Sequence, residues 1–412
     1  MTTQKKSVRP SNLLSIKESQ VHRERPMTGF GLWRLGFRPF YLGAASFSAL
    51  AIMLWLGTLI GIISLPTSTI NPLYWHAHEM VFGFAFAVIA GFLLTASNNW
   101  TGILPAAGRP LAIMFLLWLA ARVFILFGYI ELAAVTDLSF ALLLILLLGR
   151  VLWLAKIWKN FMLLGLVGLM SLLNLWFYIN LLDQPSLSPL YIVELALLVI
   201  LQLLVVMGGR VIPMFTQNGI SGVKVWKPDA LVSVVPIATM VGIIGWLSLP
   251  PRLSVVCCAV ACLMNLIRWA GWKPWKSLKT PMVWVLQLGY LFIPLSFVMM
   301  ALNAMGYASR SLPVHTIAVG AMGLIIAGMI TRTAMGHTGR QIKASSIETT
   351  FFILIAISAV LRVCAAIPAI QTVNASALLL STSGLIWSLG FLLYLWRYTP
   401  WLIRPRIDGR PG

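Results

Sequence analysis

Long apolar runs, separated by short polar or Pro/Gly-rich connections, fill the chain from residue 37 to residue 396. A helix that crosses a membrane needs about 20 largely apolar residues, and the runs divide into twelve segments of that order, some long enough to tilt. The pattern predicts membrane-spanning helices at 37–63, 73–97, 111–130, 134–154, 160–182, 189–214, 230–249, 253–271, 282–305, 313–334, 348–368 and 374–396.

Composition agrees with this pattern. The chain is 59% hydrophobic and only 10% charged, with a mean hydropathy of +0.91, whereas soluble domains are about 25% charged. Helices suit lipid because they satisfy their own backbone hydrogen bonds. We therefore expect an all-α, polytopic integral membrane helix bundle surrounded by lipid, with a twelve-helix transmembrane domain at 37–397, a basic N-terminal tail at 1–36 and a short basic C-terminal tail at 398–412.

The formal net charge of +20 has a distribution that argues against nucleic acid as a partner. Nucleic-acid binding requires the basic side chains to gather on one soluble face, but here they lie between the apolar runs. Cytoplasmic loops collect Lys and Arg. Placing the N-terminus inside puts most of the 30 basic residues on the inner side, and the even number of spans then places the C-terminus inside as well. Residues 1–36 also lack a cleavable signal peptide, so they are expected to stay as a cytoplasmic tail.

The strongest chemical signal is at the start of the second span, where His76, His78 and Glu79 lie within four positions. Ionisable side chains at membrane depth are energetically costly and usually functional, and imidazole is a common ligand of metals and of haem iron. The topology places His315, at the start of the tenth span, at the same outer depth. Two helices that present histidine at one depth favour a shared ligand over ordinary packing of hydrogen-bonded histidines.

Helical periodicity separates the two neighbouring histidines. In an α-helix His76 points with Glu79 and Gly83, on a face of small residues, whereas His78 points with Phe82. Small residues let a helix or a flat macrocycle approach closely, so His76 is the better candidate ligand and Glu79 its hydrogen-bond partner or proton acceptor. If the first turn is not helical, both imidazoles point the same way and the choice stays open.

The tenth span repeats this design. His315 lies beside a stripe that contains Gly320 and Gly323, which again permits close approach of a helix or a macrocycle. Ordinary tight packing around a hydrogen-bonded histidine is the alternative.

Arg122 lies well inside the third span, where an unpaired charge costs at least about 2.5 kcal/mol. It must therefore have an acidic partner, either in one ion pair or in a larger polar cluster that includes Arg362. The acidic residues expected in the outer half of the bundle are Glu79, Glu131, Asp137 and Glu194.

The four cysteines give no covalent haem-attachment motif and no zinc pattern. Cys258 and Cys262 share a helix face and have the chemistry to bind Cu(I). Packing as small buried residues is the favoured interpretation.

Several longer motifs resemble the NnrS family, in the right order and over nearly the whole span region. They are Gly36-Phe37-Arg38-Pro39-Phe40, His76-Ala77-His78-Glu79-Met80, Asn99-Trp100-Thr101-Gly102, Gly209-Arg210-Val211-Ile212-Pro213 and the segment from His315-Thr316 to Gly336-His337-Thr338-Gly339-Arg340. The resemblance implies a bacterial inner-membrane protein that carries haem and copper and is associated with the nitric oxide response and denitrification. The family's motif histidines map onto His76, His78, His315 and His337, without assigning them to haem or copper.

With this resemblance, we expect His76 and His315 to ligate one non-covalent haem. The two histidines share a depth and small neighbours, and Arg310 near the outer rim is expected to meet a propionate. Copper then has His78, Met80 and His337 as candidate ligands besides the two haem ligands. His337 is expected on the inner side, a membrane thickness away from His315, so the two cannot share a site. The implied partners are nitric oxide or a related small ligand and an unidentified electron-transfer protein.

Two other functions fit the same sequence. A twelve-helix secondary transporter without haem has the same topology, although transporters place their sites near the middle of the membrane. A haem-copper reductase has histidines on comparable helices, but the sixth and seventh spans here contain none, so a three-imidazole copper site cannot be assembled. The residues specify no reaction, and whether the chain is an enzyme stays open.

Overall fold

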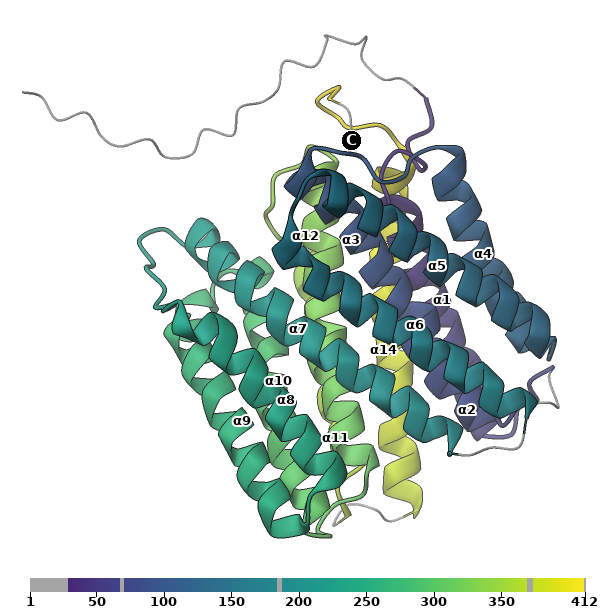
Figure 1. The fold of residues 1–412 in the computed structure, drawn as a ribbon, viewed down its shortest axis with the longest axis vertical. Coiled ribbons are helices and arrows are strands. Elements are labelled where there is room, and N and C mark those ends of the chain that lie inside the picture. The colour runs from purple at the N-terminus through teal and green to yellow at the C-terminus, as the bar shows by residue number, and fades with distance from the viewer. Residues whose placement is uncertain (1–28, 67–69, 184–186, 369–372, 411–412) are drawn as a thin grey trace, which may run out of the picture.

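A computed structural model describes residues 29–66, 70–183, 187–368 and 373–410, and these residues form helices and no strands (Figure 1). Twelve helices of this part are long and apolar enough to cross a membrane, which confirms the predicted multi-pass helix bundle. Ten continuous elements are α1 (Phe37–Leu59), α4 (Arg109–Leu126), α5 (Ile130–Leu154), α6 (Phe161–Leu182, after the short η2, Trp158–Asn160), α7 (Pro189–Gly219), α8 (Ala230–Ser248), α9 (Pro251–Gly271), α10 (Pro281–Ala304, after the short η3, Pro274–Ser277), α13 (Ser346–Cys364) and α14 (Val373–Ile403).

The two remaining spans are composite. The second span consists of α2 (Pro72–His78), η1 (Glu79–Ala85) and α3 (Phe86–Thr101). The tenth consists of α11 (Ser311–His315), η4 (Thr316–Gly323) and α12 (Leu324–His337). Both η1 and η4 are π-helices, a form that is rare and frequent at functional sites. Each begins next to a histidine, a coincidence that the apolar pattern did not predict.

Both ends of the described chain meet at one end of the bundle. The Gly31 backbone N–H donates to the Ile403 carbonyl at 2.7 Å, and the guanidinium of Arg38 donates to the carbonyls of Leu402 and Arg404 at 2.8 and 2.7 Å. These bonds use carbonyls at the end of α14, which runs to Ile403 and not to the expected residue 396. We call this the terminal end and the opposite one the distal end. Residues 1–28 of the expected N-terminal tail lie outside the described residues.

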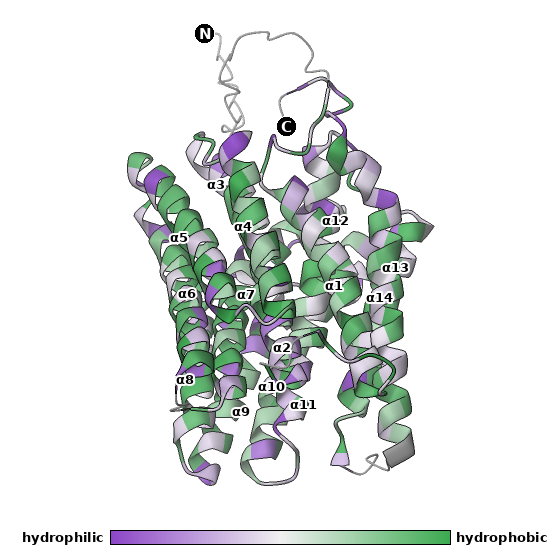
Figure 2. Cartoon of the chain, turned by 90° about the vertical axis from the view of Figure 1, so that its right-hand side faces the viewer, coloured by the Kyte–Doolittle hydropathy of each residue, from purple (hydrophilic) through white to green (hydrophobic). Residues whose placement is uncertain are grey.

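Three spans form the centre of the bundle. The buried share of the most apolar window is 83% for α2–α3, 83% for α7 and 72% for α11–α12, but only 28% for α9. The peripheral helices present apolar side chains outward, and Figure 2 shows polar colour gathered mainly toward the ends, as a lipid-facing bundle requires. The histidine-bearing α2 and α11 both lie in the half of the bundle away from the C-terminus (Figure 1).

Candidate functional site

A buried ion cluster joins the second span to α4 and α5. Arg122 on α4 lies 2.7 Å from Glu79 and 2.6 Å from Asp137, and all three side chains are almost completely inaccessible. The expected acidic partners of Arg122 are therefore these two carboxylates. The two carboxylates lower the desolvation penalty that a lone guanidinium would suffer at this depth.

His78 belongs to this cluster. Its Nδ1 lies 2.9 Å from Glu79 Oε1, and its Nε2 lies 2.9 Å from the Asn174 side-chain oxygen. The orientation of that amide is fixed because Asn174 Nδ2 donates to Asp137 at 3.0 Å. Both imidazole nitrogens therefore face acceptors, which requires a proton between His78 and Glu79 in addition to the proton on Nε2.

The clamped ring leaves His78 poorly suited to bind a metal. Phe177 stacks on the imidazole at 4.3 Å between ring centroids, and the histidine is fully buried. A metal ion would need the lone pair of one nitrogen, and would have to displace Glu79 or Asn174 to reach it. The sequence left open whether His76 or His78 is the ligand, and these contacts favour His76.

The π-helix changes which residues share a face. Glu79 was expected beside His76, but its carboxylate contacts His78 and Arg122 instead. A Cβ added at Gly83 would lie 2.7 Å from Phe47 and 3.0 Å from Arg122. The space beside Gly83 is therefore filled by the side chains of Phe47 and Arg122. The glycine makes room for Arg122 to reach Glu79, and it does not make room for a ligand of His76.

The glycines of the tenth span are also filled by neighbouring helices. A Cβ at Gly320 would lie 2.1 Å from Phe292, and one at Gly323 would lie 2.7 Å from Trp387. These contacts support the packing interpretation of the small-residue stripe. Any ligand of His315 must therefore lie on another side of this span.

His76 has a different environment from His78. Its ring stacks on Trp55 of α1, with 4.6 Å between centroids and 12° between planes. The Nδ1 atom is buried without a hydrogen-bond partner, although the residue as a whole is partly accessible. A buried imidazole nitrogen without a hydrogen-bond partner has a lone pair available to a metal or a cofactor.

His315 is held in one tautomer. Its Nδ1 donates to the Ser311 carbonyl at 2.8 Å, so its Nε2 carries the lone pair and accepts from Arg362 Nη2 at 2.9 Å. A histidine whose Nδ1–H is fixed by a backbone carbonyl is oriented as metal-binding histidines usually are. Arg362 contacts His315 directly, and its charge also acts on His76.

The other expected site residues are distributed differently. Arg310 pairs with Glu194 at 2.7 Å and stacks over Trp246 at 4.7 Å. Met80 is partly accessible at the start of η1. His337 ends α12 at the terminal end, with its ring 5.5 Å from that of Phe37. The 22 residues that separate it from His315 span roughly 30 Å at helical rise, as expected.

Several members of the site had no sequence signal of their own. Asn174 and Tyr178 both donate to Asp137. In the sequence they are single polar residues within an apolar span, and nothing there connects them to Asp137. Trp55 lies inside an apolar span, where one more large apolar side chain carries no signal, and Ser311 contributes a backbone carbonyl, which any residue supplies. In the described part of the chain, no group of three or more His, Cys, Asp or Glu side chains has the arrangement of a metal site.

Comparison with known proteins gives one finding. The sequence model of the family described as NnrS protein matches residues 31–406, nearly the whole chain. None of the curated proteins matches the chain significantly.

Proposed function

Since the chain belongs to the NnrS family, we propose that it is a haem- and copper-carrying protein of the bacterial inner membrane that acts in the response to nitric oxide. The family match supports the biological role. One structural observation supports the cofactor site: His76 has an Nδ1 without a partner, and the Nε2 lone pair of His315 is held only by Arg362, a flexible side chain that would have to release it for a cofactor to bind.

The donor set at the distal end fits a haem. Two neutral imidazoles are suitable axial ligands, and the guanidinium of Arg362 is suited to a propionate. Arg362 replaces Arg310 in this role because Arg310 is already paired with Glu194. His76, Met80 and His315 are all partly accessible, in contrast to the closed surroundings of His78.

In this site the residues of the chain position and insulate the cofactor. The Ser311 carbonyl fixes the tautomer of His315 and so keeps its lone pair on Nε2. Stacking on Trp55 holds the His76 ring nearly parallel to the indole. A haem held by His76 and His315 would supply one-electron chemistry. The neighbouring cluster keeps His78 in a hydrogen bond with Glu79, at 2.9 Å between Nδ1 and Oε1.

Copper is proposed at His337 or Met80, whose side chains suit Cu(I) or Cu(II). His78 is the weaker of the candidates because both its ring nitrogens have partners. The copper content of purified His337→Ala and Met80→Leu proteins, each compared with wild type, tests this. Full copper content in both single variants and in the double variant would refute the proposal.

The orientation follows from charge. The terminal end collects Arg38, Arg210, Arg340 and Arg406 among other cations, so we place it in the cytoplasm by the positive-inside rule. Both termini are then cytoplasmic. A reporter domain fused after residue 412 should be active only if it is a cytoplasmic reporter.

A haem-free proton-coupled transporter remains the second candidate, and the buried cluster of Arg122, Glu79, Asp137 and His78 favours it. Buried ionisable networks of this kind act as proton relays in transporters. The reduced-minus-oxidised spectrum of the purified wild-type protein separates the two functions. A haem band supports the first proposal, and haem-free protein that dissipates a proton gradient would support transport.

A further inference from the structure

A second candidate site lies at the terminal end, away from the paired histidines. A cavity of about 720 Å³ opens among the ends of α3, α7 and α12. Figure 1 shows α3 and α12 near the C-terminus, with α7 running diagonally across the bundle. The residues that line it and carry the argument are Phe92, Lys159, Met207, Arg210, Arg332 and Arg406.

The lining is strongly cationic. Lys159, Arg210, Arg332 and Arg406 all contribute, and none of the described lining residues is acidic. Arg406 is balanced by Asp408, with two contacts of 2.8 and 2.6 Å. Three cations therefore remain, of which Lys159 and Arg210 are exposed.

Arg332 is the deepest of the three. It lies on α12 less than two turns before the helix ends, and its guanidinium carbon is 3.8 Å from the centre of the Phe215 ring. Its Nε is buried and has no hydrogen-bond partner. Leaving a buried charged donor unpaired is unfavourable, so this atom indicates an acceptor supplied by a ligand.

The rest of the lining is mixed, with the polar side chains of Thr95, Asn99, Asn160, Thr333 and His337 beside a larger apolar part. Phe92, Met207 and Met329 project from the membrane-spanning parts of α3, α7 and α12. Cavities of 300–1,000 Å³ usually hold organic ligands, and a small inorganic anion would fill only a fraction of about 720 Å³. The ligand must therefore combine an anionic group with an apolar body.

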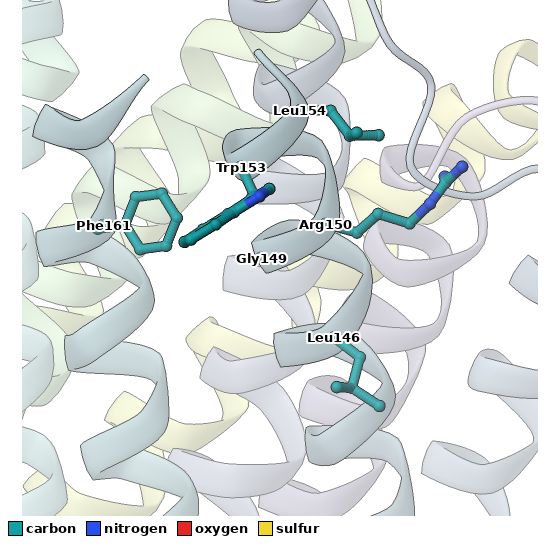
Figure 3. Close-up of a pocket in the computed structure, with 6 residues that line it drawn as sticks. All are labelled: Leu146, Gly149, Arg150, Trp153, Leu154 and Phe161. Carbon is teal, nitrogen blue, oxygen red and sulfur yellow. The ribbon is translucent and has the colours of Figure 1, made fainter. Parts of the chain in front are cut away.

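Basic residues alone do not create such a site. A shallower cavity of about 510 Å³ lies between the end of α5 and the start of α6. Its one cation is Arg150, which Figure 3 shows directed away from Trp153 and Phe161. This contrast makes Arg150 a matched control.

We propose that the terminal-end cavity binds an amphiphilic anion, with a phosphate or carboxylate group held by Lys159, Arg210 and Arg332 and an apolar body against Phe92 and Met207. Two sources carry this chemistry: an anionic phospholipid of the membrane and a soluble organic anion. Basic pockets between transmembrane helices bind acidic lipid head groups in other proteins.

The test measures ligand-induced changes in Tm of the purified full-length chain in nonionic detergent. The probes are dihexanoyl-phosphatidylglycerol, dihexanoyl-phosphatidylcholine and 2-naphthoate. We expect the anionic lipid to raise Tm and the zwitterionic lipid, with the same chains, to have no effect. Arg332→Gln should weaken anion binding about tenfold or more, as loss of a charged hydrogen bond does, whereas Arg150→Gln should bind as wild type.

The other outcomes also decide the question. A response to naphthoate but not to phosphatidylglycerol, lost in Arg332→Gln, assigns the site to a soluble anion. Equal responses to the two lipids, or equal weakening by Arg150→Gln and Arg332→Gln, would overturn the proposal. If Arg332→Gln does not fold, Lys159→Gln, a substitution at an exposed position, replaces it in the test. Anion binding that is unchanged in Lys159→Gln and does not weaken with added salt would contradict the site.

Discussion

His76 and His78 lie two residues apart and have opposite environments. His78 is fully buried, with both ring nitrogens hydrogen-bonded and a phenyl ring stacked on it. His76 is partly accessible, stacks on Trp55 and has an Nδ1 without a partner. The difference shows that a His-x-His motif can supply one residue to the architecture and one to ligand chemistry. The contrast predicts that substitutions around His78 act on stability and those around His76 act on cofactor content.

The largest effect is expected from Arg122→Leu. The substitution leaves Glu79 and Asp137 buried without their cation, and breaking a buried ion pair in this way costs roughly 3–5 kcal/mol. The variant should be obtained in low yield and with a lowered Tm in detergent. Arg150→Leu, on an exposed position of α5, is the control, and equal Tm values for the two variants would contradict the role of the cluster.

His78→Phe should destabilise the protein while leaving its haem content per folded molecule unchanged. The ring volume is nearly kept, but Glu79 and Asn174 each lose a hydrogen-bond partner, a loss of about 1–3 kcal/mol for each buried group. Thermal unfolding and haem quantitation on the same sample measure the two effects. Haem loss without a change in Tm would reverse the assignment of the two histidines.

Arg362→Gln should have a moderate effect that is confined to the cofactor. The variant loses the cation next to His315, and the retention of haem against transfer to an excess of apo-globin should fall about tenfold, as expected for one charge-assisted contact. Arg362→Lys should restore part of it. Retention equal to wild type in Arg362→Gln would exclude contact with a propionate.

The smallest effect is expected from Arg310→Gln. Its side chain is 47% exposed and that of Glu194 9% exposed, and the exposure of the guanidinium to solvent limits the contribution of the pair to about 1 kcal/mol. Tm and haem content should both stay close to wild type. A clear loss of haem here would restore the propionate role that the sequence suggested for Arg310.

The number and positions of the spans were predictable because lipid imposes length and apolarity on each helix independently. Their ends were less so: α14 continues to Ile403 because Arg38, far away in sequence, binds its last carbonyls. The need of Arg122 for acidic partners followed from burial alone. Which acids would meet it depended on helix packing.

The interior of the second span was not predictable from α-helical periodicity. The π-helical turn at Glu79–Ala85 advances each residue by a smaller angle than an α-helix, so the residues that follow Glu79 leave the α-helical faces. Glu79 and Gly83 both lie toward Arg122. The preference for His76 as ligand therefore stays a prediction that now depends on its unpaired Nδ1. The small-residue face that first suggested it is occupied by Phe47 and Arg122.

The most direct test of the account is the reduced-minus-oxidised spectrum of His76→Ala and His315→Ala measured beside His78→Phe and wild type. The account predicts a low-spin, six-coordinate haem spectrum in wild type and His78→Phe. It predicts loss of haem or a five-coordinate spectrum in each of the two alanine variants. An unchanged low-spin spectrum in His315→Ala, or its loss in His78→Phe alone, would contradict the assignment of His76 and His315 as the ligand pair.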